Sequence, residues 1–276
     1  MVTIHDLIHL LFPEHLPNRG ALLYAKFMLS HAVRKARRVI TVSERSAADL
    51  RSRYGLHAPQ LQVIANGVEP AFFESTDDHT CRVDDEVLRR HQLEPGYLLF
   101  VGNPKPHKNL RRTLQAFAGA RAAGLRRPLV LVGSDADALD GLDEDLREHV
   151  QPLGFVATAD LPTLYRQASQ LVFPSLYEGF GLPALEAMAA GTPVLTSRGS
   201  AMAEITGEVA VLVDPESVGA IQGGMLTLDR EPEAQRTPRR EQGRARAHQF
   251  TWARAAVRTL EVYEDALAGT NGGTEQ

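Results

Sequence analysis

Residues 173–194 read FPSLYEGFGLPALEAMAAGTPV and join a strand to a helix. The apolar run at 171–173 predicts the strand, and Pro183 occupies the favoured first position of the helix. Between them, Gly179 and Gly181 let the backbone approach a ligand closely, and free amides at the helix start suit a diphosphate. This sequence therefore predicts an anion site at the carboxyl end of a strand, where open α/β sheets bind ligands.

Short apolar, β-branched runs alternate with segments of helical apolar spacing along the chain. Asn109 and Asp160 each precede such a helical segment, and we expect both to act as N-caps. The alternation predicts parallel sheets with helices on both faces, so the fold class is α/β. The expected strands lie at 2–4, 39–42, 61–64, 97–101, 129–132, 171–173, 193–196 and 209–213, with a further, less regular one at 154–156.

The stretch from Asn66 to His91 interrupts the alternation with an Asn-Gly pair, a proline and an acidic cluster, which is typical of a linker leading into a helix. We place the domain boundaries accordingly, with a partial N-terminal Rossmann-like domain at 1–75, a linker at 76–92, a complete C-terminal Rossmann-like domain at 93–250, a C-terminal helix at 251–268 and a disordered tail at 269–276. The helix is expected to pack back toward the N-terminal domain, with an apolar stripe of Trp252, Ala256, Leu260 and Tyr263.

Only three strands precede the linker, which leaves the N-terminal domain incomplete. A three-stranded parallel sheet has an unpaired edge and too few helices to cover both faces. We therefore expect that the chain is a fragment, or that a second polypeptide or self-association completes this sheet. The alternative is that the three strands join the larger sheet in one domain.

Glu178 and Glu186 flank the glycine-rich loop, but their spacing alone identifies no function. The pair Glu86 and Glu94 has the same spacing in this chain, and isolated glutamates at such positions are usually surface or helix-capping acids. The sequence around Glu178 and Glu186, taken at full length, resembles the retaining glycosyltransferases of family 4, which have the two-domain GT-B fold. In that family the donor site contains two glutamates separated by seven residues.

The resemblance implies specific roles for this loop. Glu178 would hydrogen-bond hydroxyls of the donor sugar, and Glu186 would hold the ribose diol of the nucleotide, since a carboxylate accepts two vicinal hydroxyls well. The backbone of the loop would line the sugar and the phosphates, through Gly179, Phe180, Gly181 and Leu182.

A second stretch, FVGNPKPHKNL at residues 100–110, resembles the phosphate-binding loop of the same family. The resemblance implies that Gly102 and Asn103 line the donor. It also implies that Lys108 neutralises the departing diphosphate, on which charge grows in the transition state. Many relatives have arginine where this chain has His107, so we expect Lys105 or protonated His107 to supply the second cation.

A third stretch, VTIHD, ends the first predicted strand. In family 4 a His-Asp pair at this position faces the cleft between the domains. The resemblance makes His5 a candidate catalytic residue that contacts an outer hydroxyl of the donor sugar, and Asp6 a weaker candidate for positioning substrate. The family's first N-terminal strands, with their glycine-rich loop, have no counterpart in this sequence.

Composition narrows the remaining possibilities. A formal net charge of -4 gives no general attraction for nucleic acid, and the basic run at 31–38 is expected to be a solvated helix face in preference to an acidic-lipid contact. Cys81 is the single cysteine, and no segment has the length and apolarity of a membrane span. We expect a cytoplasmic protein, with at most peripheral contact at the inner face of the membrane. No metal-binding motif is present, so catalysis is expected to be metal-independent.

These features lead to one functional expectation and one alternative. The chain is expected to transfer a hexose, with retained configuration, from a nucleotide diphosphate sugar to a glycan or glycolipid hydroxyl in cell-envelope or exopolysaccharide synthesis. No cofactor is expected beyond the donor, and GDP-mannose is favoured over UDP-glucose. The alternative is a non-catalytic nucleotide-sugar-binding module, or one subunit of a split glycosyltransferase.

Overall fold

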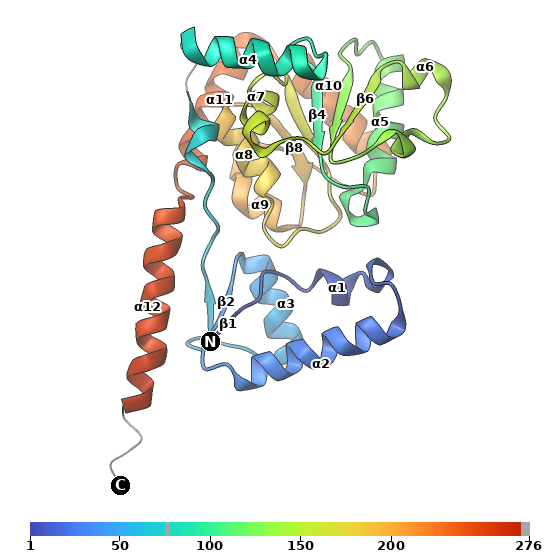
Figure 1. Ribbon diagram of the computed structural model, residues 1–276. Coiled ribbons are helices and arrows are strands. Elements are labelled where there is room, and N and C mark those ends of the chain that lie inside the picture. Colours follow the sequence, from blue (N-terminus) through green and yellow to red (C-terminus); the bar gives the residue numbers. More distant parts are fainter. Residues whose placement is uncertain (75–77, 272–276) are drawn as a thin grey trace. The chain divides into compact units, whose positions relative to one another are not determined.

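The computed structural model of the chain describes residues 1–74 and 78–271 (Figure 1). These residues form two units. Unit 1 contains residues 1–67, 177–181 and the C-terminal segment from Phe250, and unit 2 contains residues 68–176 and 182–249. The chain changes unit at Gly67, eight residues before the end of the predicted N-terminal domain, and a short segment of the predicted C-terminal domain belongs to unit 1.

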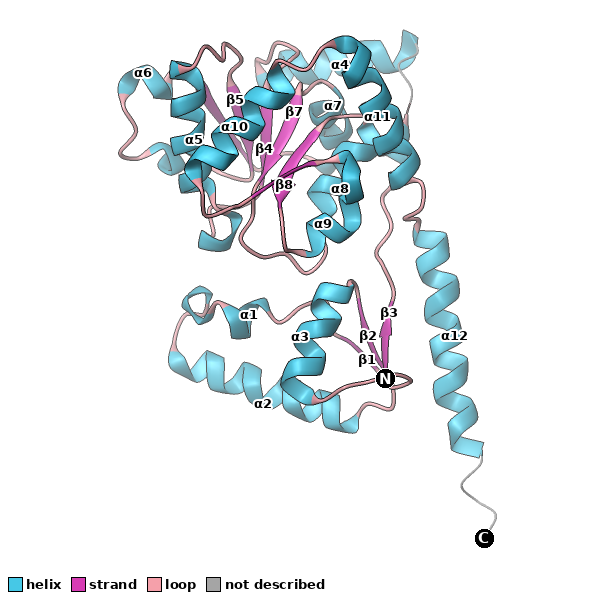
Figure 2. Cartoon of the chain, turned by 180° about the vertical axis from the view of Figure 1, so that it is seen from behind, coloured by secondary structure: helices cyan, strands magenta, loops and turns pink. Residues whose placement is uncertain are grey.

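Unit 2 contains a six-stranded parallel sheet with the order β6-β5-β4-β7-β8-β9. Its strands are β4 (Leu98–Val101), β5 (Leu129–Val132), β6 (Val150–Gly154), β7 (Gln170–Phe173), β8 (Val194–Ser197) and β9 (Val211–Val213). The strand order reverses between β4 and β7, so the topological switch point of this sheet lies there. Figure 2 shows helices on both faces of the sheet.

The helices of unit 2 include those expected after Asn109, after Asp160 and at Pro183. They are α4 (Asp78–His91), α5 (Leu110–Ala122), α6 (Glu144–Arg147), α7 (Leu161–Arg166), α8 (Leu182–Ala190), α9 (Ala201–Thr206), α10 (Val218–Asp229) and α11 (Glu233–Ala247). Short 3-10 turns lie at Pro70–Phe73, Pro106–Lys108, Ala136–Leu139, Thr158–Asp160 and Gly207–Val209. Alternate residues of β4, including Leu98 and Phe100, pack into one core with Phe117 of α5 and Met225 of α10.

The sixth strand of this sheet begins earlier than predicted. We expected residues 154–156, whereas β6 spans Val150–Gly154 and includes Pro152. A proline is tolerated there because β6 is an edge strand, where one side of the backbone needs no ladder partner. Phe155, which the prediction placed inside the strand, is 92% exposed.

Helix α4 occupies most of the segment predicted as a linker, and a buried ion pair connects it to α7. Asp84 of α4 accepts hydrogen bonds from Arg166 at 2.6 Å and from Thr163 at 2.7 Å, and both side chains of the Asp84–Arg166 ion pair are buried. Burial raises the pKa of Asp84, but hydrogen bonds from Arg166, Thr163 and Gln167 outweigh it and hold the pKa below its usual value.

Asp160 does not cap α7, contrary to the sequence prediction. Its side chain makes no capping hydrogen bond. Instead, its carboxylate accepts hydrogen bonds from Arg90 at 2.7 Å and pairs with the His91 ring at 2.9 Å, both at the end of α4. A charged donor on another helix is a stronger hydrogen-bond partner for a carboxylate than a backbone amide, so the carboxylate turns away from its own helix.

Unit 1 contains a three-stranded parallel sheet with the order β1-β2-β3. Its strands are β1 (Val2–Thr3), β2 (Val39–Thr41) and β3 (Leu61–Val63), and its helices are α1 (Ile8–Leu11), α2 (Arg19–Lys35), α3 (Glu44–Tyr54) and α12 (Trp252–Asn271), with a 3-10 turn at Pro13–His15. Val33, Val39, Leu50 and Leu61 meet in one core, in which α2, α3 and the sheet pack together. The three strands thus form a sheet of their own and do not join the larger one, which excludes the one-domain alternative.

The apolar stripe predicted to anchor the last helix is on its exposed side. Trp252, Leu260 and Tyr263 of α12 are 44%, 58% and 46% exposed. The helix instead packs through Val262, which is buried against Ile40 of β2 and Ile64. The predicted disordered tail begins at 269, but α12 continues to Asn271, and residues 272–276 lie outside the described residues.

Within the described ranges 1–74 and 78–271, no helix is long and apolar enough to cross a membrane.

Candidate functional site

The candidate site arises from the loops that follow β4 and β7, the two neighbouring strands at the switch point of unit 2. The predicted phosphate loop follows β4, and the segment with Glu178 and Glu186 follows β7. Residues of this second segment fall in both units, because 177–181 belong to unit 1 and α8 belongs to unit 2.

The phosphate loop of unit 2 is held close to β5. Gly102 donates its amide to Val132 at 2.9 Å, and its carbonyl accepts a hydrogen bond from Ser134 Oγ at 2.9 Å. Gly133 has a φ of 81°, and a Cβ there would lie 3.1 Å from the carbonyl carbon of Gly102. Glycine is required at Gly133 by both its backbone conformation and this close approach.

Lys108 lies against the start of the loop that contains it. Its Nζ is 5.0 Å from the centre of the Phe173 ring at the end of β7, within the range of a cation–π interaction. A Cβ at Gly102 would be 3.4 Å from Lys108 Cδ, so the lysine stem passes directly over this glycine. The predicted site residues Gly102 and Lys108 are thus brought together at the carboxyl ends of β4 and β7.

Asn109 does not cap α5, although the sequence predicted that it would. It has a φ of 63° and no capping hydrogen bond. Its Nδ2 donates to the carbonyls of Pro174 at 2.9 Å and Pro215 at 2.6 Å, while its Oδ1 accepts from Arg112 at 3.1 Å. The side chain therefore connects the β4–α5 loop to the segments that follow β7 and β9.

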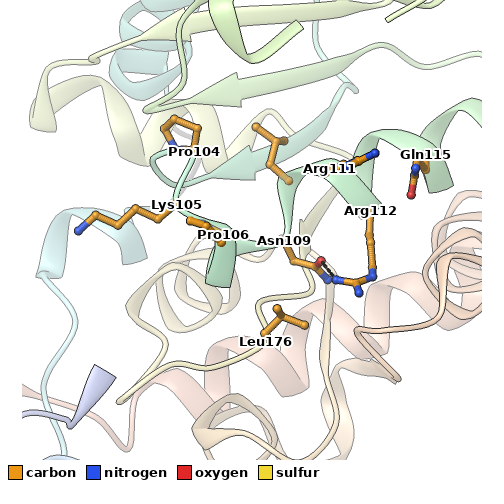
Figure 3. Close-up of a pocket in the computed structure, with 9 residues that line it drawn as sticks. Pro104, Lys105, Pro106, Asn109, Arg111, Arg112, Gln115 and Leu176 are labelled. Atoms are coloured by element: carbon orange, nitrogen blue, oxygen red, sulfur yellow. Dashed lines mark hydrogen bonds between the residues drawn. The ribbon is translucent and has the colours of Figure 1, made fainter. Parts of the chain in front are cut away.

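The two residues predicted to supply a second cation differ in their surroundings. His107 is buried, at 5% exposure, and its carbonyl accepts the amide of Leu176 at 2.7 Å. Lys105 is exposed and lines a cavity of about 530 Å³ with Arg111 and Arg112, two cations that the sequence analysis did not select. Figure 3 shows that Lys105 and Arg111 extend in different directions and that Arg112 lies beside Asn109. The consecutive arginines shortly after Asn109 were the sequence feature that could have indicated these further cations.

Glu186 lies in α8 and has a partner that the sequence analysis missed. Tyr165 of α7 is fully buried and donates its hydroxyl to Glu186 Oε2 at 2.8 Å. Burial raises the pKa of Glu186 above its usual value, and the hydrogen bond from Tyr165 lowers it in part. The pKa of Tyr165 is raised well above 10 by burial and by the neighbouring carboxylate. Leu182, another predicted donor-binding residue, is the first residue of the same helix.

Of the remaining predicted residues, Asn103 is exposed and belongs to unit 2. The others belong to unit 1, where Asp6 and Gly179 lie in contact. Asp6 follows β1, and its Oδ1 accepts the amide of Ile8 at 2.9 Å, which stabilises the start of α1. A Cβ at Gly179 would lie 2.6 Å from Asp6 Cβ, closer than real side chains approach. His5, beside Asp6, is exposed.

Aromatic side chains surround the rest of the 177–181 segment in unit 1. Phe180 is buried and meets Phe250 edge-on, with ring centres 6.1 Å apart. Gly181 has a φ of 108°, a conformation that glycine adopts without strain. Glu178 is partly buried between these anchored neighbours.

The part of the chain that the structure describes has no group of three or more His, Cys, Asp or Glu side chains that could hold a metal ion.

Comparison with known proteins places the chain in a family of glycosyltransferases. The chain belongs to the family described as Glycosyl transferases group 1, whose sequence pattern matches residues 85–246. Residues 1–72 match the pattern described as Glycosyltransferase Family 4. The predicted family and the predicted GT-B fold class are both confirmed.

Two curated relatives and one solved structure illustrate the similarity. The chain is 32% identical to O-antigen chain mannosyltransferase B of Escherichia coli over 96% of this chain and 70% of that protein. It is 27% identical to O-antigen chain mannosyltransferase RfbU of Salmonella typhimurium over 84% of this chain and 62% of that protein. The sucrose-phosphate synthase from Thermosynechococcus elongatus superposes with a TM-score of 0.77 at 24% identity, covering 97% of this chain and 68% of that one.

Proposed function

We propose that the chain transfers a hexosyl unit, mannose in preference to glucose, from a nucleotide diphosphate sugar to a hydroxyl of a growing glycan or glycolipid. The observation that supports it best is the position of both donor-type loops at the carboxyl ends of β4 and β7, on either side of the switch point. Two O-antigen mannosyltransferases among the relatives favour mannose as the sugar and cell-envelope polysaccharide synthesis as the process.

The proposed reaction retains the configuration at the anomeric carbon and uses no metal. The bond from this carbon to the diphosphate oxygen breaks, and the acceptor oxygen bonds to the same face. The acceptor proton passes to an oxygen of the departing phosphate. Lys108 stabilises the charge that grows on this phosphate, together with backbone amides of the loop. Glu178 binds hydroxyls of the sugar, and Glu186 binds the ribose diol.

The choice of donor is tested by titrating the purified chain with GDP, UDP, GDP-mannose and UDP-glucose in a calorimeter. We expect GDP-mannose to bind most tightly, and stronger binding of UDP-glucose would reverse the assignment of the donor. Transfer is then measured for the parent, Lys108→Ala and Glu178→Ala. Variants that transferred sugar as fast as the parent would overturn the proposed roles.

A specific feature of unit 1 favours a second proposal, that another polypeptide segment completes its sheet. The edge strand β1 has no partner on its outer side among the described strands. Leu23, Tyr24 and Phe27 of α2 are 67%, 67% and 62% exposed, an apolar surface that isolated domains seldom leave uncovered. A partner with an apolar face and a free strand would cover both features.

This second proposal corresponds to one subunit of a split enzyme, or to a donor-binding module that acts only with its partner. It is tested by measuring the mass of the chain in solution and its binding to vesicles that contain anionic lipid. Self-association or capture of a strand-bearing partner, lost in Phe27→Glu, is the expected result. A monomer that binds anionic vesicles through α2 would contradict it and favour the peripheral membrane contact.

A further inference from the structure

The segment Tyr177–Gly181, which we call the glutamate loop, has an unusual place in the chain. It is the middle of the connection between β7 and α8 of unit 2, yet its five residues group with unit 1. It therefore makes close contacts within unit 1. Glu178, the residue proposed to bind the donor sugar, lies inside it.

Two buried serines hold the backbone of the glutamate loop. Ser43 Oγ donates to the carbonyl of Gly179 at 2.6 Å, and Ser46 Oγ donates to the same carbonyl at 3.1 Å. Ser43 also accepts the amide of Ser46 at 3.0 Å and so caps α3. Both serines are fully buried, and their hydroxyls satisfy both lone pairs of one carbonyl at the start of a rigid helix.

Tyr177 is held just before Glu178 in the chain. Its hydroxyl donates to Asp49 Oδ2 at 2.8 Å, one helical turn beyond Ser46 on α3. The Arg45 guanidinium is 5.9 Å from the Tyr177 ring centre and pairs with Asp49 at 3.5 Å. Burial raises the pKa of Tyr177, and the hydrogen bond to Asp49 raises it further, so this phenol stays protonated and donating.

From this geometry we infer that Ser43, Ser46 and Asp49, which we call the loop anchor, are positioning residues for Glu178. They hold the residues on either side of Glu178, so contacts with α3 position the backbone of this glutamate in addition to the strand and helix that flank the loop. Gly179 packs so closely against Asp6 that the backbone of the glutamate loop has little room to take another path. A side chain that hydrogen-bonds sugar hydroxyls must be held within a fraction of an ångström of its productive position.

The inference rests on the proposed function of Glu178, and the experiment separates the two. The variant Ser43→Ala/Ser46→Ala removes both donors, and Tyr177→Phe removes the third hydrogen bond. The matched control is Ser217→Ala, which removes the corresponding capping hydroxyl of α10 in unit 2. For each protein the affinities for GDP and GDP-mannose are compared, and amide hydrogen exchange is measured on peptides that span 174–184.

We expect the parent to bind GDP-mannose more tightly than GDP. In the double-serine variant the ratio of these two affinities should fall about tenfold, while the affinity for GDP stays the same. Tyr177→Phe should lose a smaller part, and exchange of the loop amides should accelerate in both variants. Ser217→Ala should behave like the parent. A purely structural role for the serines would lower stability and leave the difference between the two ligands intact.

Two other outcomes are decisive. If the parent shows no preference for the sugar nucleotide, the proposed function of Glu178 fails, while loop exchange still decides whether the anchor holds the segment. If the parent shows the preference, and the double-serine variant retains both it and the parental exchange rate of the loop, the loop anchor is overturned.

Discussion

Glu178 and Glu186 look alike in the sequence, but they depend on different parts of the molecule. Glu178 is in the glutamate loop of unit 1, whose backbone is held by Ser43 and Ser46. Glu186 is in α8 of unit 2, with its carboxylate hydrogen-bonded to Tyr165. The contacts with Ser43 and Ser46 act on the backbone beside Glu178, whereas the contact with Tyr165 acts on the side chain of Glu186. A seven-residue spacing that reads as a single motif is therefore supported by two separate sets of contacts.

The difference shows that the two glutamates can be disturbed independently. Contacts around α7 should control Glu186 and leave Glu178 unaffected, whereas contacts around α3 should do the reverse. Each of the following changes is expected to affect only one of the two glutamates. A change that affected both would show that they are not independent.

The largest expected effect is the loss of stability in unit 2 on replacing Asp84 by Asn. The change leaves the buried guanidinium of Arg166 without a carboxylate, and we expect about 3 to 5 kcal/mol lower free energy of unfolding in urea. Because α7 also contains Tyr165, GDP affinity through Glu186 should fall as well.

The control for this change is Asp140→Asn, which removes an exposed ion pair to Arg147 and should cost less than about 1 kcal/mol. The pKa of Asp84 is lowered in the folded protein, so its stabilising contribution is present above pH 3.8 and is lost as the pH falls through the folded pKa. Equal stability of Asp84→Asn and Asp140→Asn would show that the pair does not hold α7.

The next largest effect is expected from Gly179→Ala, which acts on Glu178. The added Cβ would lie 2.6 Å from Asp6 Cβ, so the glutamate loop must move. A displacement near 1 Å should lower the rate of sugar transfer about 100-fold, while GDP affinity through Glu186 stays the same. Gly219→Ala in α10 is the control, because its Cβ meets no atom within 4 Å. Loss of GDP affinity in Gly179→Ala would show that the two glutamates are not independent.

A pH titration should separate Glu186 from the rest of the site. Its pKa is raised above 4.5 by burial, and ribose binding needs the carboxylate, so GDP affinity should weaken as the pH falls through that raised pKa, up to tenfold per unit. The contribution of Glu186 to the free energy of unfolding depends on pH in the opposite direction. Because its pKa is raised in the folded state, the protonated carboxyl stabilises the fold, and this stabilisation is lost as the pH rises. Glu186→Gln should lack this step, and the titration of the diphosphate is common to both proteins. If GDP affinity fell over the same pH range in Glu186→Gln, the titrating group would be a residue other than Glu186.

The sequence predicted what depends on local pattern and failed where distant partners decide. β4 and β5 follow from unbroken apolar runs, and both donor-type loops follow from glycines placed directly after strands. Asn109 and Asp160 were predicted as caps because their neighbours in sequence are helical, but their side chains bind residues on other segments. Tyr165 and Ser43 were missed for the same reason, since each acts on a residue far along the chain.

The smallest expected effect is that of Tyr165→Phe, and it is the most specific to Glu186. The change removes the hydrogen bond that opposes the effect of burial, so the pKa of Glu186 should rise further. Loss of one hydrogen bond to a partly buried carboxylate should lower GDP affinity at neutral pH by about fivefold, or about 1 kcal/mol.

Tyr97→Phe provides a matched comparison for this substitution. The hydroxyl of Tyr97 is also buried and donates at 2.7 Å to the carbonyl of Leu164 on α7, but it does not bind Glu186. Both variants should lose similar stability, because each gives up one buried hydrogen bond to the α7–α8 region. Only Tyr165→Phe should weaken GDP binding and move the pH step upward. If Tyr97→Phe weakened GDP binding equally, the rigidity of α7 would hold Glu186, and the hydroxyl of Tyr165 would have no separate role.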